Sequence, residues 1–385
     1  MATEKIEFTT HTWGDWKRRT DSKRLRFGLI MTGGTIVSVP NEKGALAPAE
    51  HPEQLLKFAP HLLDEADFEI IPLMNLDSSN MRTVEWRRIA SGVARRYNNY
   101  DGFLVTHGTD TMAYSATALR FALGEEIYNP VVFTGSQLPI NQSRTDAISN
   151  LEDATATLIK ARREQVSDVF IVADREVHRA VRSIKASEVR FDFISSPVTG
   201  PAGFSTASGI SWAKPHDLDH VKPPRRGLEL SPRFTQNRSG KFIGLWEEPE
   251  FRSGIITIKL EPNTGSETLR DLLLVDNPPY KAVVFTTHGA GNPPDWSLDV
   301  VAKLAQRRIP VIITPPESGM GTAIIYETAR AAVELGAIQT GDMTPSASQV
   351  KLSWLLHRSP QDKVFEYIQK HLPRNLFGEV TASRR

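Results

Sequence analysis

The sequence predicts an α/β fold with two domains, a larger N-terminal domain on a parallel sheet and a smaller C-terminal α/β domain. Short, continuous apolar runs of strand length recur along the chain, and helical patterns alternate with them. Continuous apolar strands are typical of parallel sheets that are buried on both faces. The alternation of strand and helix indicates right-handed crossovers between neighbouring parallel strands.

The predicted strands are rich in Val, Ile and Phe, and small or polar residues follow each of them directly. They cover residues 27–31, 102–106, 131–134, 169–173, 282–286 and 310–314. The helical patterns between them cover residues 83–97, 111–123 and 145–161. Ligands of such sheets bind beyond the carboxyl ends of the strands, so we expect the functional loops along one edge.

A long stretch over 206–253 is rich in Pro, Gly, Arg and Ser and has little periodicity. Such a stretch is typical of a connection between domains. A chain of 385 residues is long enough for two or three domains of roughly 150 residues each. We expect an N-terminal arm over 1–26, an N-terminal domain over 27–205, the connection, and a C-terminal domain over 254–385.

The composition argues against several classes of protein. Lys and Arg number 46 and Asp and Glu number 45, so the balance of charge gives no reason to expect a nucleic-acid partner or an anionic membrane. No run reaches the ~20 apolar residues of a transmembrane helix. Without cysteine the chain has no disulfide, thiolate nucleophile or Cys-ligated zinc. Residues 1–26 lack an apolar secretory segment, and we expect a cytoplasmic protein.

Two glycine-threonine loops follow predicted strands directly. One is Thr32-Gly33-Gly34-Thr35, and the other is His107-Gly108-Thr109-Asp110. The glycines let a substrate approach the backbone, and each threonine presents a hydroxyl at a strand end, although a plain tight turn has the same pattern. The sequence lacks both a GxxxxGK[ST] loop and a GxGxxG opening a helix after the first strand, which argues against a nucleotide site.

A threonine nucleophile needs a positioned base, because its hydroxyl reacts poorly at neutral pH. Lys185 follows the fourth predicted strand, and beside Thr109 and Asp110 it would relay a proton. A lone lysine in a loop is also typical of a solvated surface. His107 and His288 end strands in similar contexts, but no HxH or HExxH spacing accompanies them, so a structural role is favoured over a metal site.

Taken together, Thr32–Ile36 and Thr106–Thr111 resemble the two signature motifs of the bacterial-type L-asparaginase family. Further stretches agree in order and spacing, so that the resemblance runs from about residue 27 to residue 360. They are Asp77–Met81, Thr134–Gln137 with Arg144, Asp146 and Asn150, His288–Pro294, and Gly341–Thr344 with Lys351 and Leu352. The last two stretches are similar to the cytoplasmic type I enzymes.

The resemblance implies hydrolysis of the side-chain amide of asparagine, and often of glutamine, to the acid and ammonia without a metal or organic cofactor. Thr35 matches the primary nucleophile of the family, and Thr109 matches its second catalytic threonine. Asp110 falls where the family binds the α-ammonium of the substrate and orients the second triad. Lys185 matches the catalytic lysine.

The resemblance also implies how the free amino acid is bound. Ser78 and Ser79 match the residues that bind the α-carboxylate and the α-ammonium. Asn292 matches a C-terminal-domain residue that reaches the site of a neighbouring subunit. A homodimer or homotetramer is therefore expected.

The chain departs from the family in the loop 37–48, which contains no tyrosine where members usually carry one beside the primary threonine. The departure predicts weak asparaginase activity or a preference for a bulkier amide. Two alternatives remain open beside an asparaginase. One is an amidase for glutamine or a modified amino acid, and the other is a catalytically weak relative that binds an amino acid.

Overall fold

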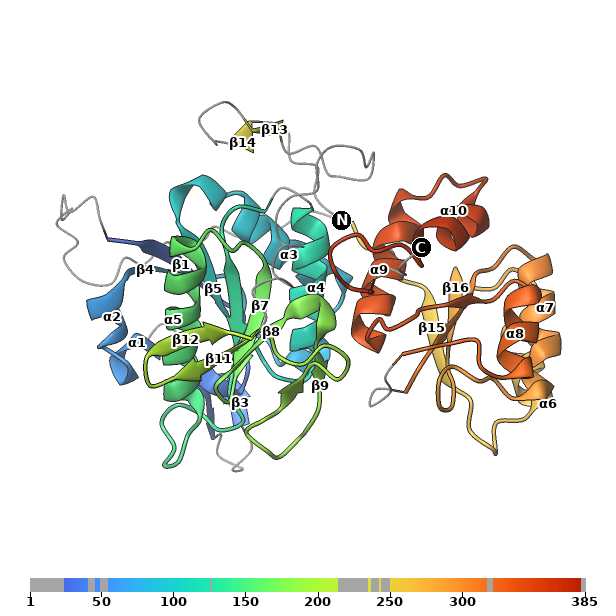
Figure 1. Ribbon diagram of the computed structural model, residues 1–385, viewed down its shortest axis with the longest axis horizontal. Coiled ribbons are helices and arrows are strands. Elements are labelled where there is room, and N and C mark those ends of the chain that lie inside the picture. Colours follow the sequence, from blue (N-terminus) through green and yellow to red (C-terminus); the bar gives the residue numbers. More distant parts are fainter. Residues whose placement is uncertain are drawn as a thin grey trace. The chain divides into compact units, whose positions relative to one another are not determined.

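The structure is a computed structural model, shown in Figure 1, and it divides into two compact units. Unit 2 comprises Val181–Ile184, Ser196–Gly200 and the chain from Pro249 onward, and unit 1 comprises the rest. The residues that the structure describes are 24–40, 46–48, 55–124, 127–213, 235–236, 242–243, 250–316 and 321–381.

Unit 1 is built on an eight-stranded sheet with the order β12-β11-β8-β7-β6-β5-β1-β4. The strands from β4 to β7 run parallel, while β8, β11 and β12 are antiparallel to their neighbours. Their bounds are β1 (Arg26–Met31), β4 (Asp67–Pro72), β5 (Gly102–Thr106), β6 (Val131–Thr134), β7 (Val169–Ala173), β8 (Glu176–Arg179), β11 (Gly203–Thr206) and β12 (Gly209–Trp212). The predicted parallel sheet is confirmed, and the antiparallel edge extends it.

The helices of unit 1 include the three that the periodicity predicts. They are α1 (Leu55–Phe58), α2 (Leu62–Glu65), α3 (Thr83–Ala94), α4 (Met112–Leu123) and α5 (Ala147–Arg163). Phe27 and Leu29 of β1 share a core with Leu151 and Leu158 of α5, and all four side chains are fully buried. Alternate residues of a strand face opposite sides of the sheet, so the face of β1 that carries Phe27 and Leu29 packs against α5.

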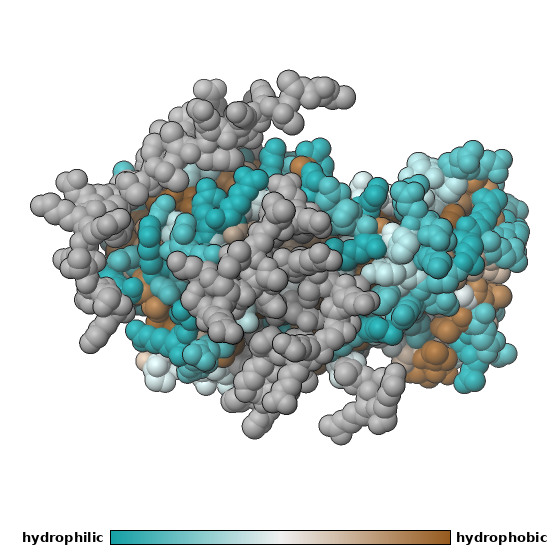
Figure 2. Space-filling view, turned by 90° about the horizontal axis from the view of Figure 1, so that it is seen from above, coloured by the Kyte–Doolittle hydropathy of each residue, from teal (hydrophilic) through white to brown (hydrophobic). Residues whose placement is uncertain are grey.

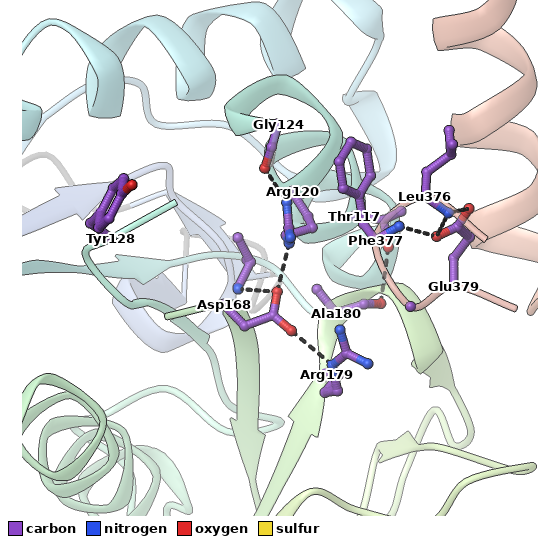
Figure 3. A network of polar contacts seen from close by, with 12 residues as sticks. Thr117, Arg120, Gly124, Tyr128, Asp168, Arg179, Ala180, Leu376, Phe377 and Glu379 are labelled. Atoms are coloured by element: carbon purple, nitrogen blue, oxygen red, sulfur yellow. Dashed lines mark hydrogen bonds and ion pairs between the residues drawn. The ribbon is translucent and has the colours of Figure 1, made fainter. Parts of the chain in front are cut away.

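A buried ion network fixes β7 and β8 beside α4 (Figure 3). The Asp168 carboxylate, just before β7, accepts hydrogen bonds from Arg120 Nε of α4 at 2.8 Å and from Arg179 Nε of β8 at 2.7 Å. Thr117 Oγ1 of α4 donates to the carbonyl of Ala180 at 2.9 Å. Buried charges are costly unless they are paired, so the network holds β8 in one position. The chain runs from β8 toward Lys185.

Unit 2 is built on a four-stranded parallel sheet with the order β15-β16-β17-β18. Its strands are β15 (Ile255–Lys259), β16 (Ala282–Thr286), β17 (Val311–Thr314) and β18 (Ile338–Gln339). Its helices are α6 (Ser266–Leu273), α7 (Leu298–Gln306), α8 (Glu327–Glu334), α9 (Pro345–Arg358) and α10 (Val364–His371). Helix α9 begins where Thr344 Oγ1 accepts the amide of Ala347 at 3.2 Å and Pro345 occupies the first turn, both favourable for a helix start.

Short strand pairs and 3₁₀ helices complete the described chain. The pairs are β2 (Ser38–Pro40) with β3 (Leu46–Pro48), β9 (Ile184–Lys185) with β10 (Ile194–Ser195), and β13 (Thr235–Gln236) with β14 (Phe242–Ile243). The 3₁₀ helices are η1 (Thr35–Val37), η3 (Ser78–Asn80), η4 (Tyr97–Asn99), η5 (Ala180–Arg182) and η7 (Asp295–Ser297).

The expected domain boundaries remain predictions, and the structure adds detail to them. Strands β12, β13 and β14 fall within the range 206–253 that the sequence predicts as a connection, and β12 belongs to the sheet of unit 1. Residues 1–23 of the expected arm and residues 41–45 of the loop without tyrosine lie outside the described residues.

Hydrophilic residues cover much of the described surface that is visible in Figure 2, and hydrophobic residues show there as smaller areas. Among the described helices, none combines the length and the apolar character that crossing a lipid bilayer requires.

Candidate active site

The two glycine-threonine loops cross at the carboxyl ends of the neighbouring strands β1 and β5. Gly33 and Gly34 have φ of 100° and 90°, a region that L side chains rarely adopt. A Cβ on Gly34 would lie 2.3 Å from the amide nitrogen of Gly108, which leaves no room for a side chain. This close approach brings Thr35, which opens η1, to the loop that carries Thr109.

Ser78 lies at the same crossing and is 2% exposed. A Cβ on Gly108 would lie 2.5 Å from Ser78 Oγ, so Gly108 is in contact with both neighbouring loops. Thr111 Oγ1 donates to the carbonyl of Ser78 at 2.8 Å and ties η3 to the chain after β5. Ser79 is exposed, and its amide donates to the Asp77 carboxylate at 2.9 Å.

Lys185 Nζ donates to Asp110 Oδ1 at 2.5 Å. The lysine side chain is 12% exposed and the aspartate side chain is 48% exposed, so the ion pair is at the rim of the site. Lys185 Nζ also donates to Glu188 Oε2, a partner that sequence reasoning missed. The only signal for Glu188 is its spacing of three residues from the lysine.

The environment of Lys185 favours its charged form. Burial lowers the pKa of the ammonium, while the hydrogen bonds and charges of Asp110 and Glu188 raise it, and the net direction is upward. Lys185 is therefore an ammonium at neutral pH, with a proton that it can donate.

His107 supports the loop of Thr109 from the interior. Its ring is fully buried, and Nδ1 lies 2.7 Å from the carbonyl oxygen of Gly108, which assigns the proton to Nδ1. Burial lowers the pKa of His107 to about 4, so the ring is neutral at pH 7. Within the described ranges, no three His, Asp or Glu side chains gather closely enough to hold a metal ion.

Asn292 belongs to unit 2, whereas the other candidates belong to unit 1. It lies in the loop after β16, where its amide donates to the carbonyl of His288 at 3.0 Å. Its side-chain Oδ1 accepts a hydrogen bond from Thr328 Oγ1. The other candidate residues therefore all lie in unit 1. In unit 2, the hydrogen bond from Thr328 orients the side chain of Asn292.

Two family models match most of the chain. The asparaginase N-terminal model matches residues 26–217, and the glutaminase/asparaginase C-terminal model matches residues 255–368. The chain belongs to the asparaginase family of amidohydrolases. The resemblance carried by the sequence motifs is thereby confirmed, and the eight-stranded and four-stranded sheets correspond to the two matched domains of the family.

Relatives in the asparaginase family include enzymes of two named kinds. L-asparaginase 1 of Escherichia coli K12 is 33% identical over 358 residues, which cover 91% of this chain and 96% of the relative. A glutamyl-tRNA(Gln) amidotransferase subunit of Aeropyrum pernix is 31% identical over 366 residues, which cover 92% of this chain and 79% of the relative. The solved L-asparaginase of Thermococcus kodakarensis superimposes with a TM-score of 0.77 at 29% identity, covering 93% of this chain and 100% of that structure.

Proposed function

We propose that the protein hydrolyses the side-chain amide of L-asparagine to L-aspartate and ammonia, with Thr35 as the nucleophile. The observation that carries the proposal is the crossing of Gly34 and Gly108, because it holds the loops of Thr35 and Thr109 against each other. An amide between two such hydroxyls has a nucleophile on one side and a proton carrier on the other.

In the first step, Thr35 Oγ attacks the carboxamide carbon, and the proton of the hydroxyl leaves to a base in the site. Backbone N–H groups of the glycine loops stabilise the resulting oxyanion. The C–N bond breaks as Thr109 gives its proton to the amide nitrogen, which leaves as ammonia, and Lys185 then returns a proton to Thr109. Water then hydrolyses the threonyl ester to aspartate. The raised pKa keeps Lys185 protonated at neutral pH, so the proton is present when Thr109, left as an alkoxide, takes it.

The charges of the substrate match the remaining candidates. A free amino acid presents an α-carboxylate, for which the Ser78 and Ser79 loop offers donors. Its α-ammonium fits the half-exposed carboxylate of Asp110. We place Asn292 of a second copy of the chain at the same site, so the active enzyme is a homodimer or homotetramer. Its expected location is the cytoplasm, in keeping with the motifs of unit 2 that are similar to the cytoplasmic type I enzymes.

Glutamine is the second candidate substrate, because one relative is named a glutamyl-tRNA(Gln) amidotransferase subunit. A weakly active protein that binds an amino acid is the third possibility. Release of ammonia is measured with asparagine, with glutamine and with neither, for the native chain and for Thr35→Ala. The proposal requires asparagine turnover that Thr35→Ala abolishes. Faster turnover of glutamine supports the second candidate, and binding of asparagine without turnover in the native chain contradicts the proposed activity.

A further inference from the structure

The turn that carries Glu188 is closed by its own side chains. Ser187 Oγ accepts the amide of Val189 at 3.2 Å and the amide of Arg190 at 3.0 Å. The amide of Ala186 donates to the carbonyl of Phe193 at 2.8 Å and joins the two ends of the turn. A serine that accepts the following amides stabilises a tight turn, so the backbone of Glu188 is held in one conformation.

Gln137 fixes this turn to the rest of unit 1. Its Nε2 donates to the carbonyl of Arg190 at 2.9 Å and to the carbonyl of Ser187 at 3.3 Å. Its backbone amide donates to the Asp146 carboxylate, with distances of 3.1 and 3.0 Å to the two oxygens. Asp146 is 7% exposed and also accepts from Asn150 Nδ2 of α5 at 3.1 Å. The position of Glu188 is therefore set by buried groups at the start of α5.

Two carboxylates from different parts of the chain share the ammonium of Lys185. Asp110 comes from the loop after β5, and Glu188 comes from the turn after β9. Asp110 uses Oδ1 for the lysine, and its Oδ2 has no hydrogen-bond partner within the described residues. Two carboxylates and one ammonium leave a net charge of −1. That charge attracts a second cation to the rim of the site.

We propose that Glu188 is a positioning residue of the active site, which holds Lys185 together with Asp110 and leaves the second oxygen of Asp110 for the α-ammonium of the substrate. The assignment rests on the proposed function. Glu188 acts in two ways. It orients the Lys185 ammonium jointly with Asp110, and it supplies the negative charge that remains for a cationic amino group once the lysine is neutralised.

The test compares Glu188→Gln with Asp192→Asn. Asp192 is a matched control, because it lies in the same turn, is 52% exposed and pairs with Arg190 at 3.0 Å rather than with Lys185. Glu188→Gln should raise KM for asparagine by about two- to fivefold, the effect of an exposed ion pair. It should lower the pKa of Lys185, because one of the two carboxylates that stabilise the ammonium loses its charge. Asp192→Asn should change neither KM nor the pKa of Lys185. Glu188→Asp keeps the carboxylate, so its KM and its Lys185 pKa should lie between those of the native chain and those of Glu188→Gln.

The pKa of Lys185 is read without turnover by competitive acetylation across pH, followed by mass spectrometry of the peptide that contains Lys185. If Glu188→Gln and Asp192→Asn both match the native chain in this labelling and in KM, the role of Glu188 is refuted. If asparagine is not a substrate, the proposed function fails, and the labelling still decides whether Glu188 acts on Lys185. Gln137→Ala, which releases the turn, should shift the labelling in the same direction as Glu188→Gln.

Discussion

Lys351 Nζ and Glu379 Oε1 form an ion pair of 2.6 Å inside unit 2, where neither side chain is exposed to solvent. The Glu379 carboxylate also accepts the amides of Leu376 and Phe377, at 3.0 and 2.6 Å, and these contacts are visible in Figure 3. One carboxylate thus neutralises the buried lysine of α9 and closes the turn near the end of the described chain.

Lys351→Met should strongly destabilise the protein, because it leaves the Glu379 carboxylate buried without its cation. Breaking a buried pair in this way costs about 3–5 kcal/mol of unfolding free energy. Lys303→Met is the control, since Lys303 pairs with Asp299 at the surface and its loss should cost less than about 1 kcal/mol. Urea unfolding measures the free energy of unfolding of both variants. Equal losses of this free energy in Lys351→Met and Lys303→Met would contradict the expectation.

His107 should make the stability of unit 1 depend on pH. Burial lowers the pKa of the folded ring from its ordinary 6.5 to about 4, so between these values the unfolded chain binds a proton that the folded chain does not. The stabilisation is fully present above pH 6.5 and is lost as the pH falls to about 4, by about 3 kcal/mol. His107→Gln should flatten the curve of unfolding free energy over this range. A slope unchanged by the substitution would show that another group titrates.

The sequence predicts the centre of each sheet better than its edges. Strands such as β5 and β7 are buried on both faces and therefore read as continuous apolar runs. The edge strand β4 alternates in burial and carries Asp67 and Glu69, so it lacks that pattern. Strand β8 is short and begins and ends with charged residues, so its place in the sheet depends on pairing that no local pattern reveals.

The candidate site shows the same limit. Loops with Gly34 or Gly108 are recognisable, because close approach of two backbones demands glycine. Glu188 is not recognisable, because an exposed glutamate in a turn has no pattern that distinguishes it from a solvated one. Its contact with Lys185 depends on Gln137, which lies near the turn only after folding. Contacts between segments far apart in the chain are the part that the sequence alone leaves undetermined.

Gly34→Ala should strongly reduce activity, because the new Cβ would meet the backbone of Gly108 and push the loops of Thr35 and Thr109 apart. Misplacement of reacting groups by about 1 Å costs on the order of 100-fold in rate. Gly209→Ala is the matched control, with φ of 101° and no atom within 4 Å of the added Cβ. It should lose about 1–3 kcal/mol of stability through backbone strain and keep its activity. Asparagine turnover of the two purified variants distinguishes the local clash from general strain.

Thr109→Ala and Lys185→Met should each lower kcat/KM for asparagine by several powers of ten, a loss on the order of 4 kcal/mol. In the proposed mechanism the two groups serve one proton path, so the double variant should be little worse than either single one. Lys160→Met removes a partly exposed lysine that pairs with Glu164, and it should leave the rate unchanged. Losses that add in the double variant would show that Thr109 and Lys185 act separately.

Asn292 should act on the site of a second copy of the chain. Thr35→Ala removes the proposed nucleophile from unit 1, and Asn292→Ala removes the side chain that Thr328 orients in unit 2. Each variant alone should be nearly inactive, whereas their co-expression should restore turnover, because a mixed oligomer contains one site with both native residues. Light scattering should give a particle larger than one chain. Full activity of a single-chain particle, or mixed oligomers without any recovered turnover, would contradict a site shared between subunits.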